Sequence, residues 1–257
     1  MKKIGIIGAG NMGGAFYRAL AQEFAEDELY VCDHNQEKLN ALNALHITAD
    51  ANELIESVGT VILAIKPQSF DQFVSALSAS LADKLVISIM AGVSVAKIQQ
   101  AAGSGRVVRS MPNLGVELGK GVTGWFAGAE VTNKDKQFAE KIFLAGGESI
   151  EVKDEKMIDA VAALSGSGPA YFFYLTELLQ KKAEELGFAP AAAKKIAEAT
   201  FIGAAGLFEK GNKSAGEWRE AVSSKGGSTV EAIKYLRENK FDEIFWEAIE
   251  RARRRWE

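Results

Sequence analysis

Three glycines near the amino terminus have the spacing of a loop that binds a dinucleotide cofactor. Gly8, Gly10 and Gly13 follow the pattern Gly-x-Gly-x-x-Gly, which is weak evidence alone because glycine-rich turns are common. Here the loop follows the apolar run Lys3–Ile7 and precedes a stretch with helical spacing. In such a unit the first glycine permits a tight turn, the second admits a pyrophosphate, and the third lets helix and strand pack closely. A dinucleotide bound at this loop would carry redox chemistry. The alternative explanation of the three glycines is a strand–helix turn that binds no cofactor.

An acidic residue follows this loop at the distance expected for a ribose contact. Asp33 ends the second predicted strand, twenty residues after Gly13, where a carboxylate typically bonds the adenosine ribose hydroxyls. A carboxylate there favours NAD because it repels a 2′-phosphate, but His34, Asn35 and Lys38 offer hydrogen-bond donors. Both NADH and NADPH therefore stay open as cofactors.

The third predicted strand, Thr60–Ile65, ends in the segment AIKPQ, residues 64–68. The carboxyl ends of strands in an open α/β sheet face the ligand crevice. Pro67 stops the strand and Lys66 can approach the ribose or pyrophosphate, although a surface lysine in a turn gives the same pattern. The segment SIMAG, residues 88–92, follows the fourth predicted strand in the same way.

Side chains for other kinds of chemistry are scarce. The 257 residues include 2 histidines and 1 cysteine, so neither a metal site nor a Cys–His nucleophile pair nor an internal disulfide is expected. The net charge of −4 argues against nucleic-acid binding, which needs a basic stripe. No apolar run reaches the roughly 18 residues of a membrane helix. We therefore expect a cytoplasmic protein without a metal.

The elements that would position the candidate residues fall into two halves. Short β-rich runs alternate with amphipathic stretches up to residue 153, which is typical of a Rossmann-type, doubly wound parallel α/β sheet. The predicted strands are Lys3–Ile7, Leu29–Cys32, Thr60–Ile65, Leu85–Ile89, Val107–Arg109, Val122–Phe126 and Ser149–Val152. The predicted helices are Ala15–Glu26, Glu37–Leu45, Phe70–Leu81, Ala170–Leu186, Ala191–Glu209 and Asp242–Trp256. We predict a dinucleotide-binding domain at 1–153 and an all-helical domain at 154–257.

An ordered series of motifs resembles the pyrroline-5-carboxylate reductase family. The motifs are IGIIGAGNMG, AIKPQ, SIMAGV, RSMPN, DAVAALSGSGPAY and VSSKGGSTVEAI. They run through the whole chain and are far more specific together than the glycine spacing alone. The resemblance implies reduction of 1-pyrroline-5-carboxylate to L-proline with NADPH or NADH, the final step of proline biosynthesis. It also implies a helical second domain that forms a homodimer, or a ring of dimers.

The resemblance further implies a set of site residues. Two segments would line the dinucleotide: Gly8, Ala9, Gly10, Asn11, Met12, Gly13 and Ala64, Ile65, Lys66, Pro67. Asn52 would lie beside the adenosine, and Ile89, Met90 and Ala91 beside the nicotinamide. The substrate would meet Glu155, Ser228 and Thr229, with the Thr229 hydroxyl near the imine nitrogen. The loop at Gly226 and Gly227 leads into a predicted helix, so its N–H groups also suit a carboxylate on physical grounds.

Several positions depart from the family's pattern. The common MPNTP is MPNLG in this chain, with Leu114 and Gly115. The common SPGGT is SKGGS, with Lys225 and Ser228. Ala221 stands where the family often has an asparagine that contacts the cofactor, so one contact is expected to be lost.

Two other functions stay open. A hydroxyacid dehydrogenase has a Gly-x-Gly-x-x-x-Lys-x-x-x-Asn helix, but the frame that starts at Gly166 places Phe172 and Thr176 at the lysine and asparagine positions. That reading therefore lacks a general base. A non-catalytic sensor would bind the dinucleotide without turnover.

Overall fold

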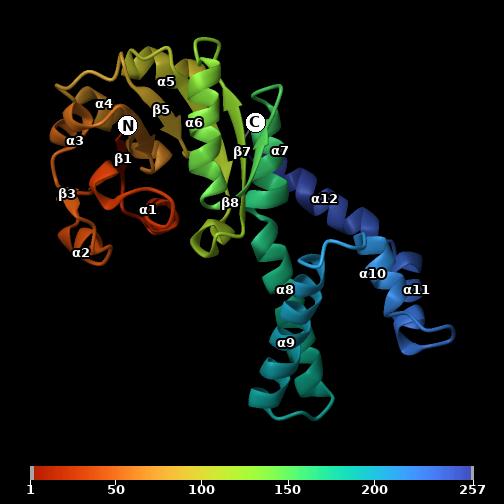
Figure 1. The fold of residues 1–257 in the computed structure, drawn as a ribbon. Coiled ribbons are helices and arrows are strands. Elements are labelled where there is room, and N and C mark those ends of the chain that lie inside the picture. Colours follow the sequence, from red (N-terminus) through yellow and green to blue (C-terminus); the bar gives the residue numbers. More distant parts are fainter. Residues whose placement is uncertain (1–2, 256–257) are drawn as a thin grey trace. The chain divides into compact units, whose positions relative to one another are not determined.

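The computed structural model describes residues 3–255 (Figure 1), which fall into two compact units. The first unit holds the described residues up to Ser167 and those from Arg253 on, and the second is Gly168–Ala252. Residues 154–167, which the sequence groups with the helical half, thus belong to the first unit.

The first unit is built on one eight-stranded sheet with the order β3-β2-β1-β4-β5-β6-β7-β8. The strands are β1 (Ile4–Ile7), β2 (Leu29–Cys32), β3 (His46–Thr48), β4 (Thr60–Leu63), β5 (Leu85–Ser88), β6 (Val107–Pro112), β7 (Gly121–Ala127) and β8 (Gly147–Glu151). Neighbouring strands are parallel except β6 and β7, which are antiparallel. The predicted Rossmann-type, doubly wound sheet is confirmed.

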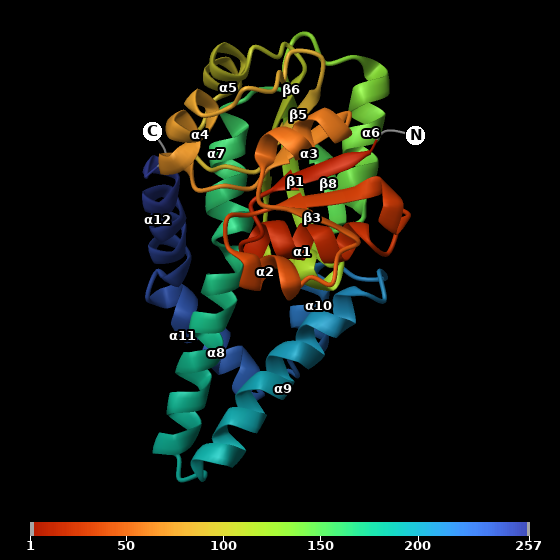
Figure 2. The same cartoon turned by 90° about the vertical axis from the view of Figure 1, so that its left-hand side faces the viewer.

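Helices cover both faces of this sheet. The α-helices of the unit are α1 (Asn11–Leu20), α2 (Gln36–Asn40), α3 (Ala51–Ser57), α4 (Phe70–Ser75), α5 (Val95–Ala102), α6 (Asn133–Leu144) and α7 (Met157–Val161). Alternate strand residues point to opposite faces: Ile62 joins a core with Phe16 of α1 and Phe143 of α6, whereas Val61 and its neighbours pack on α3, α4 and α5. The succession of these elements can be followed in Figure 2.

Short helical turns complete the unit. They are η1 (Glu26–Glu28), η2 (Pro67–Ser69), η3 (Leu114–Leu118) and the π-helical turn η4 (Ala162–Gly166). The predicted first helix, Ala15–Glu26, was wrong at both ends, because α1 begins directly after its N-cap Gly10 and ends at Leu20. The strand predicted to reach Ile65 ends at Leu63, and the strand β3 was not predicted at all. The sheet is otherwise the one that the apolar runs indicate.

The second unit is entirely helical. Its elements are α8 (Gly168–Glu185), α9 (Pro190–Phe208), α10 (Ala215–Ala221), α11 (Ser228–Glu238) and α12 (Phe241–Arg254), of which the part up to Ala252 belongs to this unit. Pro190 occupies the first turn of α9, where its missing N–H has no helical partner to lose. Trp256, with which the predicted last helix ends, lies outside the described residues.

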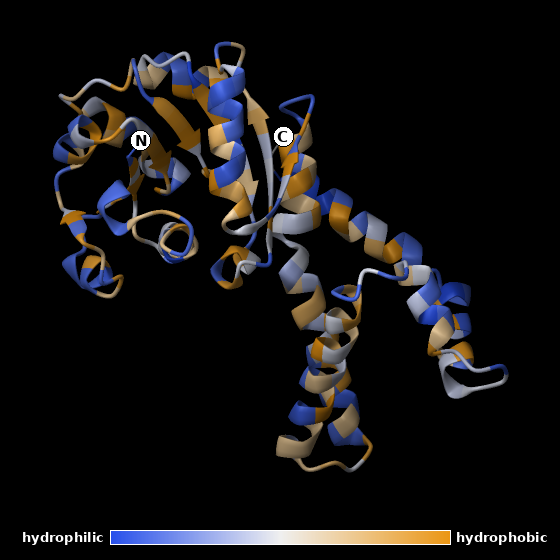
Figure 3. Cartoon of the chain, in the orientation of Figure 1, coloured by the Kyte–Doolittle hydropathy of each residue, from blue (hydrophilic) through white to orange (hydrophobic). Residues whose placement is uncertain are grey.

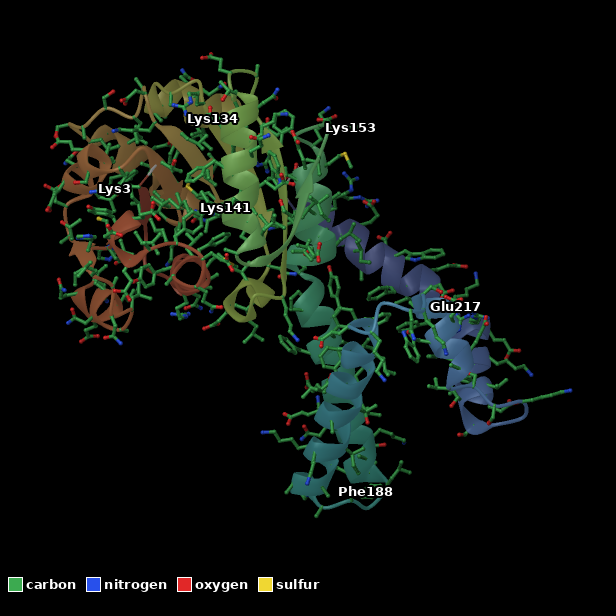
Figure 4. All side chains as sticks on the ribbon, viewed as in Figure 1. Lys3, Lys134, Lys141, Lys153, Phe188 and Glu217 are labelled. Carbon is green, nitrogen blue, oxygen red and sulfur yellow. The ribbon has the colours of Figure 1, made fainter. Side chains whose placement is uncertain are left out.

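Aromatic contacts join the helices of this unit to one another. Phe172 of α8 stacks on Phe201 of α9 with ring centroids 5.7 Å apart, and Tyr171 of α8 meets Phe245 of α12 edge to face. Many other apolar side chains are exposed, and orange segments in Figure 3 run along α8 and α9. Phe188, labelled in Figure 4, follows the end of α8 and is half exposed. Within residues 3–255, no helix is both long enough and apolar enough to cross a lipid bilayer.

Candidate active site

The glycine loop joins β1 to α1. Gly8 has a φ of +105°, and a Cβ there would lie 2.5 Å from the Ala64 carbonyl oxygen, so the position demands glycine. A Cβ on Gly13 would lie 1.9 Å from the Gly8 carbonyl oxygen, whereas one on Gly10 would meet nothing within 4 Å. Gly8 and Gly13 therefore make the turn and the close packing that their spacing predicts. The open space at Gly10 is what the approach of a pyrophosphate requires.

Helix α1 presents its first turn directly after this loop. Gly14 N–H is bonded to the Gly10 carbonyl oxygen at 2.7 Å, and the preceding N–H groups of Asn11, Met12 and Gly13 have no helical acceptor. Such a helix start carries partial positive charge. It therefore suits the phosphates that the sequence predicts there.

Asp33 links the glycine loop to the turn after β2. Its Oδ2 accepts a hydrogen bond from Ala9 N–H at 2.7 Å, and its Oδ1 accepts one from Asn35 N–H at 2.8 Å. The side chain is only 5% exposed. Lys38 Nζ lies 4.0 Å from Oδ2 and His34 Nδ1 lies 3.4 Å from Oδ1. Negative charge and candidate donors for a phosphate thus occur side by side.

A cavity of about 520 Å³ opens beside the loop, a volume in the usual range for small-molecule sites. Its lining includes predicted cofactor residues from three strand ends: Gly8, Gly10, Asp33, Ala64, Ile65 and Lys66. It also includes His34 and Lys38, which the sequence offers as donors, and residues that we did not predict to contact a cofactor: Ile7, Cys32, Ala49, Ala51, Ser69 and Phe73. The spacing of Phe70 and Phe73 predicts the buried face of a helix. It therefore gave no sign that Phe73 lines the cavity.

Asn52 and Pro67 lie close to this cavity. Asn52 follows the lining residue Ala51, and its side-chain oxygen accepts hydrogen bonds from Ser78 N–H at 2.9 Å and Ala79 N–H at 3.0 Å. It therefore holds the loop after α4, and its role beside adenosine stays a prediction. Pro67 begins η2 directly after the lining residue Lys66.

The chain's one cysteine forms part of the cavity wall. Burial, with a further contribution from the negative charge of Asp33, raises the pKa of the Cys32 thiol to about 11. The thiol therefore stays protonated at neutral pH, and a protonated thiol is a poor nucleophile. Within residues 3–255, no three side chains of His, Cys, Asp or Glu gather as metal ligands.

The loop predicted to lie beside the nicotinamide is held by two serines. Ser110 Oγ of β6 donates to the Ser88 carbonyl oxygen at 2.9 Å, and Ser88 Oγ accepts from Met90 N–H at 3.2 Å. Ser88, Ser110 and Met90 are all buried. The segment Ile89–Ala91 therefore leaves the end of β5 in a fixed direction.

Glu155 is bonded within the first unit. Its Oε1 accepts from Val95 N–H, the first residue of α5, at 2.8 Å and from Arg109 Nη1 at 3.2 Å. Arg109 Nη2 donates to Asp159 Oδ1 at 2.7 Å. The predicted contact of Glu155 with substrate stays a prediction. The arginine and the second carboxylate were not predicted, because no local spacing connects them.

The motif MPN meets the motif SGSGP. Asn113 Nδ2 donates to Ser165 Oγ at 2.9 Å, while Asn113 Oδ1 accepts from Gly115 N–H at 3.0 Å and from Val122 N–H at 3.2 Å. Gly115 stands where the family commonly has proline, which has no N–H to donate. The departure therefore supplies one of the bonds that orient Asn113. The side chain of Leu114 is exposed.

The remaining predicted substrate residues lie in the second unit, before and at the start of α11. Gly226 has a φ of +73°, and Gly227 is the N-cap with an extended backbone and no side-chain cap. Ser228 and Thr229 form the first turn, and Thr229 is half-buried. The N–H groups of this turn have no helical acceptor, as anion binding requires. Lys225, next to this loop, is exposed.

Two family profiles match this chain. The profile described as pyrroline-5-carboxylate reductase dimerisation matches residues 155–257. The profile described as NADP oxidoreductase, coenzyme F420-dependent, matches residues 3–92.

Known proteins resemble the chain along nearly its full length. The pyrroline-5-carboxylate reductase of Aquifex aeolicus is 32% identical over 97% of this chain and 94% of that protein. The solved structure of the reductase from Coxiella burnetii has a TM-score of 0.89 and 34% identity, covering 99% of this chain and 97% of that one. A Plasmodium falciparum pyrroline carboxylate reductase solved with NADP bound has a TM-score of 0.86 and 26% identity, covering 99% and 97%.

Proposed function

Because this chain belongs to the pyrroline-5-carboxylate reductase family, we propose that it reduces 1-pyrroline-5-carboxylate to L-proline with NADPH or NADH. The observation that carries the proposal is full-length similarity to reductases of this name together with the cavity at the glycine loop. The chain is an oxidoreductase with a nicotinamide dinucleotide as its cofactor.

The residues around the cavity fit such a cofactor. The backbone at Gly10 has open space in front of it, the start of α1 offers N–H groups, and Asp33 faces the cavity that would take the ribose. When bound, the cofactor supplies a hydride for the carbon of the imine bond. The predicted contacts of Asn52, Lys66 and the segment Ile89–Ala91 with this cofactor are part of the proposal.

The chain's own residues orient and polarise the imine. The Thr229 hydroxyl donates a hydrogen bond near the imine nitrogen, and the N–H groups of Gly226 and Ser228 hold the substrate carboxylate. The N–H group of Gly227 between them donates to the Ser224 carbonyl oxygen at 2.9 Å and fixes the turn. Hydride addition at the carbon moves the electron pair of the C=N bond onto the nitrogen, which takes up a proton from water to give the amine of proline. A hydrogen bond to the nitrogen favours this step because negative charge develops there. No metal and no nucleophilic side chain is required, in keeping with the protonated state of Cys32.

A hydroxyacid dehydrogenase is the weaker alternative. Thr176 Oγ1, at the place of that family's asparagine, donates to the Phe172 carbonyl oxygen of its own helix at 2.8 Å. Phe172, at the place of the lysine, offers no group that could accept a proton. This pair therefore favours imine reduction.

The second unit supports a homo-oligomer. Phe172, Phe173 and Tyr174 on α8 are 53%, 59% and 59% exposed, and large exposed apolar patches usually mark interfaces. We propose that the chain forms a homodimer through this unit, and that dimers can assemble further into a ring. The mass of the particle in solution, measured by light scattering, tests the assembly. The cytoplasmic location stays a prediction.

Oxidation of NADPH or NADH in the presence of 1-pyrroline-5-carboxylate tests the activity. We expect a loss of reduced-cofactor absorbance that depends on both substrates, with L-proline as the product. Absence of turnover with either cofactor would refute the proposal. Cofactor binding without turnover would favour the sensor, and oxidation of small hydroxyacids would favour the dehydrogenase.

A further inference from the structure

Two residues of β6 and the residue that follows the strand hold one segment of the chain. Arg109, Met111 and Asn113 follow one another at every second position, so they share one face of the sheet. Arg109 bonds Glu155 and Asp159, a Cβ on Gly166 would lie 2.8 Å from Met111 Cε, and Asn113 bonds Ser165. The contacted segment, residues 155–166, contains α7 and the π-helical turn η4.

Arg109 is the buried member of this row. Its side chain is 7% exposed, while those of Glu155 and Asp159 are 25% and 20% exposed. Its two terminal nitrogens donate to two different carboxylates, and its Nε is buried without an acceptor among the described residues. One guanidinium therefore fixes two carboxylates, one before α7 and one inside it.

Glu155 connects Arg109 to the loop that follows β5. Both of its bonds use Oε1, which accepts from Val95 N–H as well as from Arg109. Val95 begins α5, directly after the loop Ile89–Ser94 that leaves β5. The other end of this loop is held by Ser88 and Ser110. Glu155 thus fixes the far end of the loop through a backbone N–H sixty residues away.

Stability alone does not account for this arrangement. A buried cluster of charges is weak evidence for stability, because desolvation offsets much of the attraction. Leaving the buried Nε–H without an acceptor adds a further cost. An apolar side chain on β6 would avoid both costs. Placement of the groups that Arg109 bonds is therefore the better explanation for a guanidinium here.

We propose that Arg109 is a positioning residue of the reductase site, which orients Glu155 and, through Glu155, the loop Ile89–Ser94. The inference rests on the proposed function, because that function places the nicotinamide beside this loop. Glu155 then has a positioning role through Oε1. Misplacing a reacting group by about 1 Å can lower a rate by about 10²-fold, so a local defect is enough for a large effect.

Four single-residue variants and one double variant test the proposal in the full-length protein. Arg109→Met removes both bonds, Arg109→Lys keeps a charge that can reach one carboxylate, and Glu155→Gln weakens the link to Val95 and Arg109. The matched control is Arg106→Met, three residues earlier, which removes another partly buried ion pair, between Arg106 and Asp135. The Arg106 side chain donates to Asp135 and to the Asp83 carbonyl oxygen, and neither acceptor belongs to the loop or to residues 155–166.

The kinetic arm separates positioning from general destabilisation. We expect Arg109→Met to lower kcat by about 10- to 100-fold with the dissociation constant of NADPH changed less than about threefold, since the cavity at Gly10 is untouched. Arg109→Lys should recover part of the loss, and Arg106→Met should lower the melting temperature with kcat retained. The kcat of the double variant of Arg109→Met and Glu155→Gln should lie within about threefold of the kcat of the slower single variant, because the effects of coupled residues do not add. Unchanged kcat in Arg109→Met, or an equal loss in Arg106→Met, overturns the proposal.

Hydrogen exchange gives a readout that needs no turnover. The Val95 amide and the loop Ile89–Ser94 should exchange at least about tenfold faster in Arg109→Met and Glu155→Gln, and at the wild-type rate in Arg106→Met. Unchanged exchange at Val95 also overturns the proposal. A wild-type protein that turns over neither cofactor would refute the proposed function instead, and the exchange measurement would still decide whether Arg109 orders the loop.

Discussion

Replacing Gly13 with alanine is expected to push α1 away from β1 and to weaken dinucleotide binding. The added Cβ would lie 1.9 Å from the Gly8 carbonyl oxygen and 3.0 Å from Ala64 Cβ. Real Cβ atoms essentially never come closer than 3.0 Å to another heavy atom, so the helix start must move by about 1.1 Å. The obstacle is backbone rather than a flexible side chain, and it cannot rotate out of the way.

The size of the effect follows from this displacement. Overpacking in a well-packed core costs about 1–3 kcal/mol, which in a protein of this size corresponds to a fall of roughly 2–12 °C in melting temperature. The same shift moves the N–H groups of the first turn of α1 by about 1 Å, and displacements of that size cost about 10²-fold where geometry decides the outcome. We therefore expect the dissociation constant of NADPH to rise at least about tenfold.

Two neighbouring glycines provide matched controls. At Gly14, one residue further along the same helix, the nearest atoms to an added Cβ are Arg18 Nη1 and Leu42 Cδ2, both at 3.4 Å. Gly14→Ala should therefore bind NADPH normally and gain roughly 0.5–1 kcal/mol from helix propensity. At Gly10, which lines the cavity, an added Cβ meets nothing in the protein. Gly10→Ala should therefore lose binding with little change in stability.

Thermal unfolding and NADPH fluorescence titration measure the two quantities separately. The expected pattern is loss of both in Gly13→Ala, loss of binding alone in Gly10→Ala, and loss of neither in Gly14→Ala. Normal melting temperature and normal binding in Gly13→Ala would refute the packing argument. Equal losses in all three variants would do the same, since the three positions differ in their surroundings.

Three further predictions concern single side chains. The Cys32 thiol, with its pKa raised to about 11, should react with an alkylating reagent at pH 8 about 10²-fold more slowly than the thiol of the unfolded chain. Because the native thiol loses its proton at a higher pH than the unfolded one, the free energy of unfolding should fall as the pH rises from 9 to 11. Equal alkylation rates in the native and unfolded protein would contradict the raised pKa. Asp33→Asn removes the negative charge at the cavity and should raise the ratio of kcat/KM for NADPH to that for NADH by about tenfold; an unchanged ratio would show that the carboxylate does not face the ribose. Thr229→Ala should lower kcat by about 10²-fold with NADPH affinity retained, and unchanged turnover would remove the hydroxyl from the site.

Much of the sheet was predictable because its strands are buried on both faces. The runs at Ile4–Ile7, Leu29–Cys32 and Leu85–Ser88 are apolar throughout or nearly so, and such runs read as central parallel strands. The strand β3, with the sequence His-Ile-Thr, is short and lies at the edge of the sheet. It therefore lacks the apolar run that identifies the others.

The site was predictable only where its residues are neighbours in sequence. The glycine loop and Asp33 follow from spacing within one strand–helix–strand unit. The contacts of Arg109 with Glu155 and Asp159 join residues 46 and 50 positions apart, and those of Asn113 with Ser165 span 52. Such pairs form only because the tertiary fold brings residues 155–166 beside β6, and no pattern within a short stretch of sequence predicts that placement. The motif resemblance indicated that these segments matter, but not which atoms they join.

The two hydrogen bonds that Asp33 accepts, from Ala9 N–H and from Asn35 N–H, bear on how cofactor preference can evolve. Asp33, which we predict to discriminate between the two dinucleotides, also ties together two of the turns that line the cavity, so we expect a substitution there to change selectivity and assembly at once. His34 and Lys38 contribute side chains to the same cavity without being part of that tie. Lineages that drift from one cofactor to the other should therefore change positions 34 and 38 first and replace the aspartate last, and a designer who wishes to switch the preference should follow the same order.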